Sequence, residues 1–600
     1  MKNFEVARLF DLMADLLEIK GENPFRIRAY RRAAQNVEAL PEEIEALAAE
    51  GRLEEIPGIG HDLAGKISEY LKTGRMKDVE VLRKVIPAGV VELMQVPGVG
   101  PKTAKLLYEK QKITSVAQLE KLAKAGKLRG LPGIRAKTEQ NIIKGIEVVK
   151  TGQERMTLGK ALPLARELAR ALEHLPDVKQ IELAGSIRRR KETVGDIDIL
   201  ITSSRPEAVM NAFVRLPQVG EVLEKGSTKA SIRHREGIQV DLRVVEPDCF
   251  GAALAYFTGS KQHNIRIREM AVKKGLKISE YGVFKESSGK RIVGATEEEV
   301  YAAVGLPWIP PELREDLGEI EAALRRELPK LIECSDIRGD LHCHTNASDG
   351  QHTIEALVRE AAKRRYEYVL ISDHSKSATV AGGLSAEELL AHVKKIRVVQ
   401  KKFTGITLLA GSECDILPDG SLDYPDEVLA KLDLVVAAVH SRFKQPAAEM
   451  TDRICKALRN PHVQILAHPT GRLLGERAAY EVALDQVFRV AKEYGKAVEI
   501  NSHPLRLDLN DVHARRAREL GVPIAISTDT HVLDQLETIE LGVATARRAW
   551  VEKSGVINAL PLSKLRAWAE RARTSRVLKN TLLVQAVQKG PDARRRGSEE

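Results

Sequence analysis

Six histidines and three carboxylates in the second half of the chain have the residue types and spacing of metal ligands. They stand in the short motifs HCHT, ISDHS, GSECD, AVHS, LAHP and STDTH, with one aspartate shortly after the first motif. The ligands are His342, His344, Asp349, His374, Glu413, His440, His468, Asp529 and His531. Nine such ligands exceed the needs of one ion, so we expect two or three Mn²⁺, Zn²⁺ or Fe ions, which would activate water and hold a phosphoryl group.

A second set of carboxylates lies nearer the middle of the chain. Asp196 and Asp198 are two residues apart in the apolar run DIDILIT, so on a strand they would share a face, and Asp241 could meet them from a neighbouring strand. Three such carboxylates can hold two Mg²⁺ or Mn²⁺ ions, the arrangement that supports nucleotidyl transfer. Acidic pairs in strands are also common on protein surfaces. The motifs around these residues must therefore distinguish a catalytic metal site from an ordinary exposed surface.

The elements that position the histidines are predicted by apolar runs. Seven runs follow residue 335, and each precedes a helical stretch: 340–344, 368–374, 407–413, 434–440, 464–468, 498–501 and 524–531. Parallel strands need crossovers of that length, so the pattern predicts a seven-stranded β/α barrel of distorted TIM type. Strand ends converge at one mouth of such a barrel. The pairs His342/His344 and Asp529/His531 would each share one strand face.

The carboxylate set lies in a region of α/β texture. From about residue 156, strand-like runs at IELAGS, DIDILIT and IQVDLRVVE alternate with helical stretches. After the last of these runs, a helical segment is expected to about residue 335. The first third is helical throughout, because apolar residues recur three and four apart and β-branched runs are few.

Three similar turns interrupt the helical first third, at 56–60, 96–100 and 131–134. The first two read Pro-Gly-apolar-Gly, and the third has Arg135 in place of the closing glycine. Such elements indicate helix-hairpin-helix units, in which the glycines allow a tight turn and the following amides bind a DNA phosphate; here they are Gly58, Gly60, Gly98 and Gly100. A plain turn between helices uses similar residues. Residues 101–150 carry 12 Lys and Arg against 4 Glu, which favours DNA.

Composition narrows the class of protein. Of the 600 residues, 43% are hydrophobic and 30% charged, and no stretch has the roughly 20 apolar residues of a membrane span, so we expect no membrane partner and a cytoplasmic location. Five widely spaced cysteines without a CxxC motif indicate reduced thiols.

The histidine motifs resemble those of the polymerase and histidinol phosphatase (PHP) family over about 336–575. The resemblance implies a distorted seven-stranded barrel with a trinuclear metal site. Every ligand position of that family is filled, which implies a competent phosphoesterase.

The carboxylate region resembles family X DNA polymerases, since Tyr256-Phe257-Thr258-Gly259-Ser260 with Asn264 and Arg268 is similar to their nucleotide-binding segment. This resemblance implies an α/β nucleotidyltransferase palm with a helical thumb, and gapped or primed double-stranded DNA and a dNTP as partners. It implies catalytic roles for Asp196, Asp198 and Asp241, and nucleotide contacts from Gly185, Ser186, Arg189, Tyr256, Phe257, Gly259, Asn264 and Arg268.

The first hairpin, with PFRIRAYRRAA before it, resembles the lyase domain of family X. The Schiff-base lysine of that domain falls six residues after the second glycine, at Lys66. Asp62 and Arg26 stand where the vertebrate repair enzyme has lysines, so two roles stay open for Lys66: lyase nucleophile and ligand of a 5′-phosphate.

Together the resemblances identify a bacterial or archaeal-type family X polymerase with a C-terminal PHP domain. They imply a monomeric gap-filling repair polymerase at the nucleoid, with a 3′–5′ exonuclease. Abasic-site cleavage and 3′-phosphate removal stay open as further activities of the phosphoesterase. The expected divisions are a lyase-like domain (1–85), fingers (86–155), palm (156–247), thumb (248–318), linker (319–335), PHP barrel (336–575) and a disordered tail (576–600). Two rivals are a small-molecule phosphatase fused to a template-independent nucleotidyltransferase and a DNA-binding scaffold with silent sites. The hairpins disfavour the first, and the complete ligand sets disfavour the second.

Overall fold

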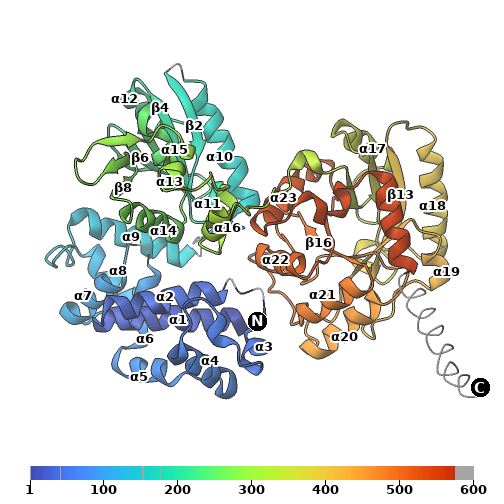
Figure 1. Cartoon of the computed structure of the whole chain (residues 1–600), viewed down its shortest axis with the longest axis horizontal. Helices are drawn as coiled ribbons and strands as arrows, with labels where there is room; N and C mark the ends of the chain where they lie inside the picture. Colours follow the sequence, from blue (N-terminus) through green and yellow to red (C-terminus); the bar gives the residue numbers. More distant parts are fainter. Residues whose placement is uncertain are drawn as a thin grey trace, which may run out of the picture. The chain divides into compact units, whose positions relative to one another are not determined.

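The structure is a computed structural model of the chain (Figure 1). It describes residues 2–574, except 39, 41, 97, 152–154 and 176, so the expected tail at 576–600 lies outside the described residues. Two compact units are distinguished, one of residues 1–156 with 210–242 and one of residues 157–209 with 243–600. Among the described residues, no helix combines the length and the apolar character that crossing a membrane requires.

The first third of the chain is helical, as predicted. Apolar side chains from its helices, including Phe10, Tyr30 and Leu107, form one buried cluster. The helices are α1 (Lys2–Lys20), α2 (Pro24–Glu38), α3 (Ile44–Ala49), α4 (His61–Thr73), α5 (Lys77–Val85), α6 (Ala88–Glu92), α7 (Pro101–Gln111), α8 (Val116–Lys124) and α9 (Ala136–Thr151).

All three predicted turns between these helices have the same form. Gly58, Gly98 and Gly133 have φ of +79°, +89° and +83°, a conformation that strongly favours glycine. In each turn the amide of the following apolar residue donates to a carbonyl three positions earlier, at 3.0, 2.9 and 3.0 Å. The closing position needs no glycine, because Gly60 and Gly100 have φ of −92° and −80°, which any residue adopts. The third turn therefore forms although Arg135 replaces the closing glycine.

The palm region contains a five-stranded sheet in the order β2-β4-β7-β6-β5. The strands β2 (Val178–Leu183) and β4 (Asp196–Ser203) are antiparallel, as are β5 (Val219–Lys225) and β6 (Lys229–His234); β7 is Gln239–Val245. The helices α10 (Leu158–Glu173), α11 (Gly185–Arg188) and α12 (Pro206–Phe213) accompany the sheet. Strands β5 and β6 correct the sequence analysis, which expected a helical stretch there.

The segment before residue 335 is only partly helical, which corrects the expectation of a continuous helical segment. The helices α13 (Phe250–Thr258), α14 (Lys261–Val272), α15 (Glu297–Ala303) and α16 (Glu319–Arg325) are joined by a three-stranded antiparallel sheet, β8 (Leu276–Ser279), β9 (Gly282–Lys285) and β10 (Arg291–Val293). Each of these strands has three or four residues, too few for a two-residue alternation to stand out in the sequence.

The C-terminal region forms the predicted barrel of seven parallel strands, each paired with the next along the chain. The strands are β11 (Gly339–Cys343), β12 (Tyr368–Ile371), β13 (Thr407–Asp415), β14 (Leu434–Ala438), β15 (Ile465–Leu466), β16 (Ala497–Asn501) and β17 (Ile524–Ser527). A single bridge between Cys343 and Thr530 joins the two edges, so the barrel is nearly closed.

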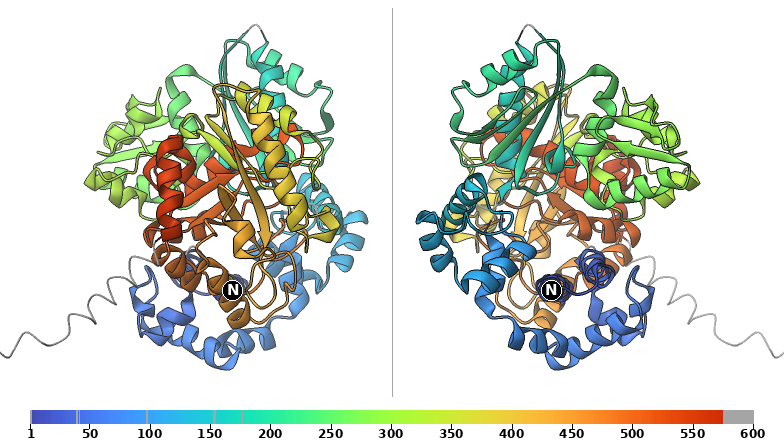
Figure 2. Two further views of the ribbon diagram at one scale, coloured as in Figure 1. Left: turned by 90° about the vertical axis from the view of Figure 1, so that its right-hand side faces the viewer. Right: turned by 90° about the vertical axis from the view of Figure 1, so that its left-hand side faces the viewer.

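Helices cover the outside of the barrel strands (Figure 2). They include α17 (Ile354–Lys363), α18 (Ala386–Gln400), α20 (Ala447–Leu458), α21 (Leu484–Glu493), α22 (Asp511–Glu519) and α23 (Ile539–Arg548), with the short α19 (Asp426–Leu429) between β13 and β14. The amphipathic α21 illustrates why they pack there, since Leu484, Val487 and Phe488 share one face and are buried in the core between helices and strands.

A helix over 562–574 closes the barrel at the start of its strands. Leu565, Trp568 and Ala569 pack into the same buried cluster as Tyr368 and Leu434, the first residues of β12 and β14. The ammonium of Lys496 donates to the carbonyl oxygen of Ala572 at 2.8 Å, which holds the last turn of this helix. The opposite end of the barrel, where the strands finish, is left for the predicted ligands.

Candidate metal centre and nucleotide site

The barrel brings the predicted histidine and carboxylate ligands together at the C-terminal ends of its strands. His342 and Glu413 lie within β11 and β13, and the others follow directly after strands or in the loop after β11. Eight of the nine form three overlapping groups, and within each group the ligand atoms lie within 4.8 Å of one another. The groups are His344, Asp349, His374 and His531; His342, His344, Glu413 and Asp529; and His374, Glu413 and His440.

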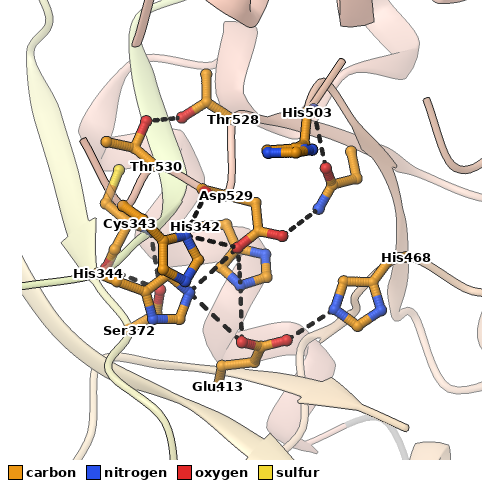
Figure 3. Close-up of polar contacts among 12 residues, drawn as sticks. His342, Cys343, His344, Ser372, Glu413, His468, His503, Thr528, Asp529 and Thr530 are labelled. Carbon is orange, nitrogen blue, oxygen red and sulfur yellow. Dashed lines mark hydrogen bonds and ion pairs between the residues drawn. The ribbon is translucent and has the colours of Figure 1, made fainter. Parts of the chain in front are cut away.

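Glu413 is the centre of the cluster. Its Oε2 lies 3.2 Å from Nε2 of His342 and 3.1 Å from Nδ1 of His374. Its Oε1 lies 3.2 Å from Nε2 of His440 and 2.8 Å from Nε2 of His468. Figure 3 shows the carboxylate of Glu413 between the rings of His342 and His344 on one side and His468 on the other. His468 belongs to none of the three groups but contacts Glu413, which two of them share.

Two aspartates complete the cluster on the other side. Oδ1 of Asp529 lies 3.3 Å from Nε2 of His344. Oδ2 of Asp349 lies 3.2 Å from Nε2 of His531 and 3.5 Å from Nε2 of His374. His344 belongs to both the first and the second group and so links Asp349 and His531 to Asp529.

The cluster has the donor set and the unsatisfied atoms of a metal centre. Within the described part of the chain, neither ring nitrogen of the buried His344 makes a hydrogen bond, and the same holds for Nε2 of His342 and Oε2 of Glu413. Buried polar atoms normally have partners, so these atoms fit coordination of an ion. Burial lowers the pKa of His344 to about 4, which keeps the ring neutral and able to bind a cation.

The acidic residues that orient the histidines were not predicted from the sequence. Nδ1 of His342 lies 2.8 Å from Oε1 of Glu499, and Nδ1 of His440 lies 2.6 Å from Oδ1 of Asp415. A carboxylate on one ring nitrogen fixes the tautomer and directs the other nitrogen toward the ion. Asp415 follows Glu413 by two residues in the motif GSECD, a spacing that could have indicated it.

Asp529 is itself held by two residues that the sequence analysis did not single out. Nδ2 of Asn501 donates to Oδ2 of Asp529 at 3.1 Å, and Nε of Arg506 lies 3.2 Å from the same oxygen. The expectation that Asp529 and His531 share a strand face is wrong. Strand β17 ends at Ser527, and Asp529 has φ of +55°, so a loop turns both side chains into the cluster.

The predicted palm carboxylates lie on neighbouring strands of the five-stranded sheet. Asp196 and Asp198 are on β4, and Asp241 is on β7, which is next to β4 in the sheet order. Gly185 has φ of +62° and lies so close to Asp198 that a Cβ there would collide with Oδ2 of Asp198. Only glycine allows the start of α11 to approach this carboxylate. Among the described residues, no close group of ligand atoms includes the palm carboxylates.

The predicted nucleotide-binding residues surround the end of α13. Arg189 follows Gly185 and Ser186 of α11, and its Nη1 donates to the carbonyl oxygen of Thr258, next to Gly259. The rings of Tyr256 and Phe257 meet edge to face with centroids 5.2 Å apart. Nδ2 of Asn264 donates to the carbonyl oxygen of Tyr256 at 2.7 Å, and Nε of Arg268 to that of Asn264 at 3.2 Å.

Comparisons with known proteins identify domains in both halves of the chain. Family models match a helix-hairpin-helix domain at residues 1–76, a SAM-like helix-hairpin-helix tandem at 90–147, a DNA polymerase beta thumb at 253–315 and a PHP domain at 340–503. The protein named DNA polymerase/3′-5′ exonuclease PolX from Bacillus subtilis (strain 168) is 38% identical over 573 residues, 95% of this chain and 100% of that protein. The chain belongs to the bacterial family X DNA polymerases that carry a PHP domain.

Two further relatives are similar to parts of this family X polymerase. DNA polymerase lambda of Arabidopsis thaliana is 26% identical over 347 residues, 52% of this chain and 62% of that protein. A protein named probable phosphatase from Thermoanaerobacter sp. (strain X514) is 30% identical over 230 residues, 36% of this chain and 89% of that protein.

Lys66, the predicted lyase or phosphate-binding lysine of this polymerase, lies on α4 and is engaged by acidic side chains. Its ammonium donates to Oδ1 of Asp62 and lies 3.4 Å from Oδ2 of Asp78. Burial alone would lower the pKa of Lys66, but Asp62, Tyr30 and Asp78 together raise it. A Schiff base needs a neutral amine, so this environment opposes the nucleophilic role.

Proposed function

We propose that the chain is a template-directed DNA polymerase that fills short gaps and that its PHP barrel removes nucleotides from 3′ ends. The observation that carries the proposal is the convergence of eight predicted ligands at the mouth of the barrel, with His468 against Glu413, in a chain whose palm also has carboxylates on adjacent strands. Family membership supports both activities, since the Bacillus subtilis relative is named for both.

In the palm, Asp196, Asp198 and Asp241 would hold two Mg²⁺ or Mn²⁺ ions, which when bound lower the charge of the triphosphate and activate the primer hydroxyl. Ser186 and Arg189 would bind the triphosphate, with the backbone at Gly185 and Gly259 close beside it. Tyr256 and Phe257 would contact the sugar, and Asn264 and Arg268 the nascent base pair. The hydrogen bond from Asn264 to Tyr256 supports this arrangement, because it ties the two groups together.

In the barrel, the nine ligands would hold two or three Mn²⁺, Zn²⁺ or Fe ions, which supply an activated water and neutralise the phosphate. The chain's own contribution is to hold the rings and the carboxylates in fixed orientations. Glu499 and Asp415 do this for His342 and His440, and Arg506 and Asn501 do it for Asp529.

The hairpins that contain Gly58, Gly60, Gly98 and Gly100 would hold the DNA backbone on either side of a gap without reading its sequence. The substrate would be gapped or primed double-stranded DNA with a dNTP, bound by a monomer in the cytoplasm at the nucleoid. The third turn, at Gly133, has the same geometry and lies within the same tandem family match.

For Lys66 we propose binding of a 5′-phosphate rather than lyase chemistry. A charged ammonium suits a phosphate, and the contacts with Asp62 and Asp78 keep Lys66 charged. Borohydride treatment with abasic DNA should leave no covalent adduct at Lys66, whereas Lys66→Ala should weaken binding to a gap with a 5′-phosphate more than to one without. A trapped adduct that disappears in Lys66→Ala would contradict this assignment.

A second activity of the barrel is removal of a 3′-phosphate. The relative named probable phosphatase favours it, because this chain matches 89% of that protein's length. Release of inorganic phosphate from a 3′-phosphorylated primer, measured beside nucleotide release from a 3′-hydroxyl primer, tests this activity.

The whole proposal is tested by one assay on the full chain. Gapped DNA is incubated with one dNTP at a time and with none, in Mg²⁺ or Mn²⁺, and both lengthening and shortening of the primer are followed. We expect extension only with the complementary nucleotide, and shortening when nucleotide is omitted. Addition of all four nucleotides irrespective of template would instead indicate a template-independent transferase.

A further inference from the structure

Arg548, the last residue of α23 in the barrel region, reaches a palm residue directly. Its side chain is only 5% exposed. Nη1 donates to the carbonyl oxygen of Arg189 at 2.8 Å and to Oε1 of Glu315 at 3.0 Å, while Nε donates to Oδ2 of Asp511 on α22 at 2.7 Å. One arginine therefore joins two helices of the barrel to the proposed triphosphate site.

The carboxylate of Glu315 is shared between two arginines. Its Oε1 accepts from Nη1 of Arg548 and also from Nε of Arg189 at 3.0 Å. With Nη1 of Arg189 bonded to Thr258, the guanidinium is held at two of its three nitrogens. The third, Nη2, makes no hydrogen bond to any residue that the structure describes, so it stays available to an anion.

The charges in this group are balanced. Burial alone would raise the pKa of Glu315, but Arg548, Lys191 and Arg189 together lower it to about 2. Glu315 is therefore a carboxylate at any working pH. Without Arg548, both Glu315 and Asp511 would lose a cationic partner, and the charge of Glu315 would be balanced only by Arg189 and Lys191.

We propose that Arg548 is a positioning residue for the incoming nucleotide. By holding Glu315 and the carbonyl group of Arg189, it fixes the guanidinium of Arg189 toward the triphosphate and keeps the positive charge of Arg189 from being cancelled. The inference rests on the proposed function, in which Arg189 binds the triphosphate. It gives the barrel a part in nucleotide addition that is separate from its metal centre.

The neighbouring Arg547 provides a matched control. Its Nε donates to Oε1 of Glu312 at 2.7 Å and its Nη1 to the carbonyl oxygen of Ile332 at 3.0 Å. Arg547 thus joins the same helix to the same segment before the barrel, but none of its hydrogen bonds within the described residues reaches Arg189 or Glu315. If substitution of Arg548 acted only by weakening contact between α23 and the segment before the barrel, substitution of Arg547 would have the same effect.

The test is single-nucleotide insertion into gapped DNA by the full chain, comparing wild type with Arg548→Gln, Arg548→Lys, Arg547→Gln and Arg189→Gln. We expect Arg548→Gln to raise KM for the dNTP about tenfold with a much smaller change in kcat, the pattern for lost substrate binding. Arg548→Lys, which keeps the charge, should recover part of the loss. Arg547→Gln should stay within about twofold of wild type. Shortening of 3′ ends should be unchanged in all four variants.

The outcomes separate the inference from the function on which it rests. If Arg189→Gln raises KM but Arg548→Gln behaves like Arg547→Gln, the inference is overturned and the proposed function stands. If Arg189→Gln leaves KM unchanged, the triphosphate role of Arg189 fails, and the inference fails with it. If the Arg548→Gln protein does not fold, Arg548→Lys provides the test. A KM for the dNTP equal to that of wild type in Arg548→Lys would overturn the positioning role of the Arg548 guanidinium.

Discussion

Oε1 of Glu499 lies 2.8 Å from Nδ1 of His342, although the two residues are 157 positions apart. The other carboxylate oxygen of Glu499 accepts the backbone amide of His468 at 2.8 Å. Glu499 thus fixes one ligand by its ring and another by its backbone. It orients two of the nine predicted ligands without being one of them.

Glu499→Gln should weaken metal binding without abolishing it. Loss of such a supporting carboxylate typically lowers metal affinity about 10- to 100-fold. Titration of the metal-free protein with Mn²⁺, followed by calorimetry, measures the effect, and the exposed Glu427 supplies the control Glu427→Gln. Unchanged Mn²⁺ affinity in Glu499→Gln would contradict the orienting role.

His344→Ala should remove both 3′–5′ degradation and most bound metal while sparing nucleotide addition. His344 belongs to two of the three ligand groups, so its loss affects more than one position. Metal content by mass spectrometry and primer shortening on the same preparation measure this. His352→Ala, in the loop after β11 but outside the cluster, is the control and should keep both properties.

Asp198→Ala should abolish extension of a gapped primer and leave 3′ degradation intact, because the two metal sites use different carboxylates. Asp248→Ala, an exposed aspartate paired with Arg291 at 3.1 Å, is the matched control. Extension by the Asp198→Ala protein at the wild-type rate would rule out the palm assignment.

Gly98→Ala should weaken binding of gapped DNA, because a side chain at φ of +89° strains the hairpin turn by about 1–2 kcal/mol. Gly74→Ala is the control, since Gly74 has a similar φ of +68° at the end of α4 but lies in no hairpin. For wild type, log affinity should fall with log salt by about 0.7–0.9 for each phosphate contact, and Gly98→Ala should show a shallower slope. Equal losses in both variants would mean that the turn does not contact DNA.

Lys496 should make the stability of the barrel depend on pH. Burial, with a smaller contribution from Arg573, lowers its pKa to about 7, whereas a lysine in the unfolded chain titrates near about 10.4. Between these values the unfolded chain binds the extra proton, so stability rises with pH, by up to about 1.4 kcal/mol per pH unit.

Lys496→Met should remove this slope, so that wild type gains stability relative to the variant from about pH 7 to 10. Thermal unfolding by calorimetry across that range measures the difference. The exposed Lys492 gives the control Lys492→Met, which should follow wild type. A constant difference between wild type and Lys496→Met at all pH values would contradict the buried titration.

Site residues were predicted best where they stand at the ends of predicted strands. His342, His374 and Glu413 were predicted as ligands because each stands at the end of an apolar run, and the barrel topology then brings them together. Glu499 could not be predicted in the same way, since a glutamate within a strand has no local mark of its partner 157 positions away.

Other misses have local physical causes. Strand β10 has three residues, so no alternation distinguishes it from a loop. Asp529 was placed on a strand because its spacing to His531 fits one, but the strand stops at Ser527 and a left-handed turn at Asp529 produces the same convergence. The third hairpin formed without its closing glycine because only Gly133 needs a positive φ.

The helix over 562–574 makes completion of the barrel a late step in synthesis. Trp568 and Ala572 complete the base of the barrel, and they are synthesised after all seven of its strands. Domains fold as units during synthesis, the N-terminal ones first. On a translating ribosome, the helical first third is thus able to fold while the barrel still lacks its base. The proposed triphosphate site, which Arg548 of α23 contacts, and the ligand cluster of the barrel are both completed late in synthesis.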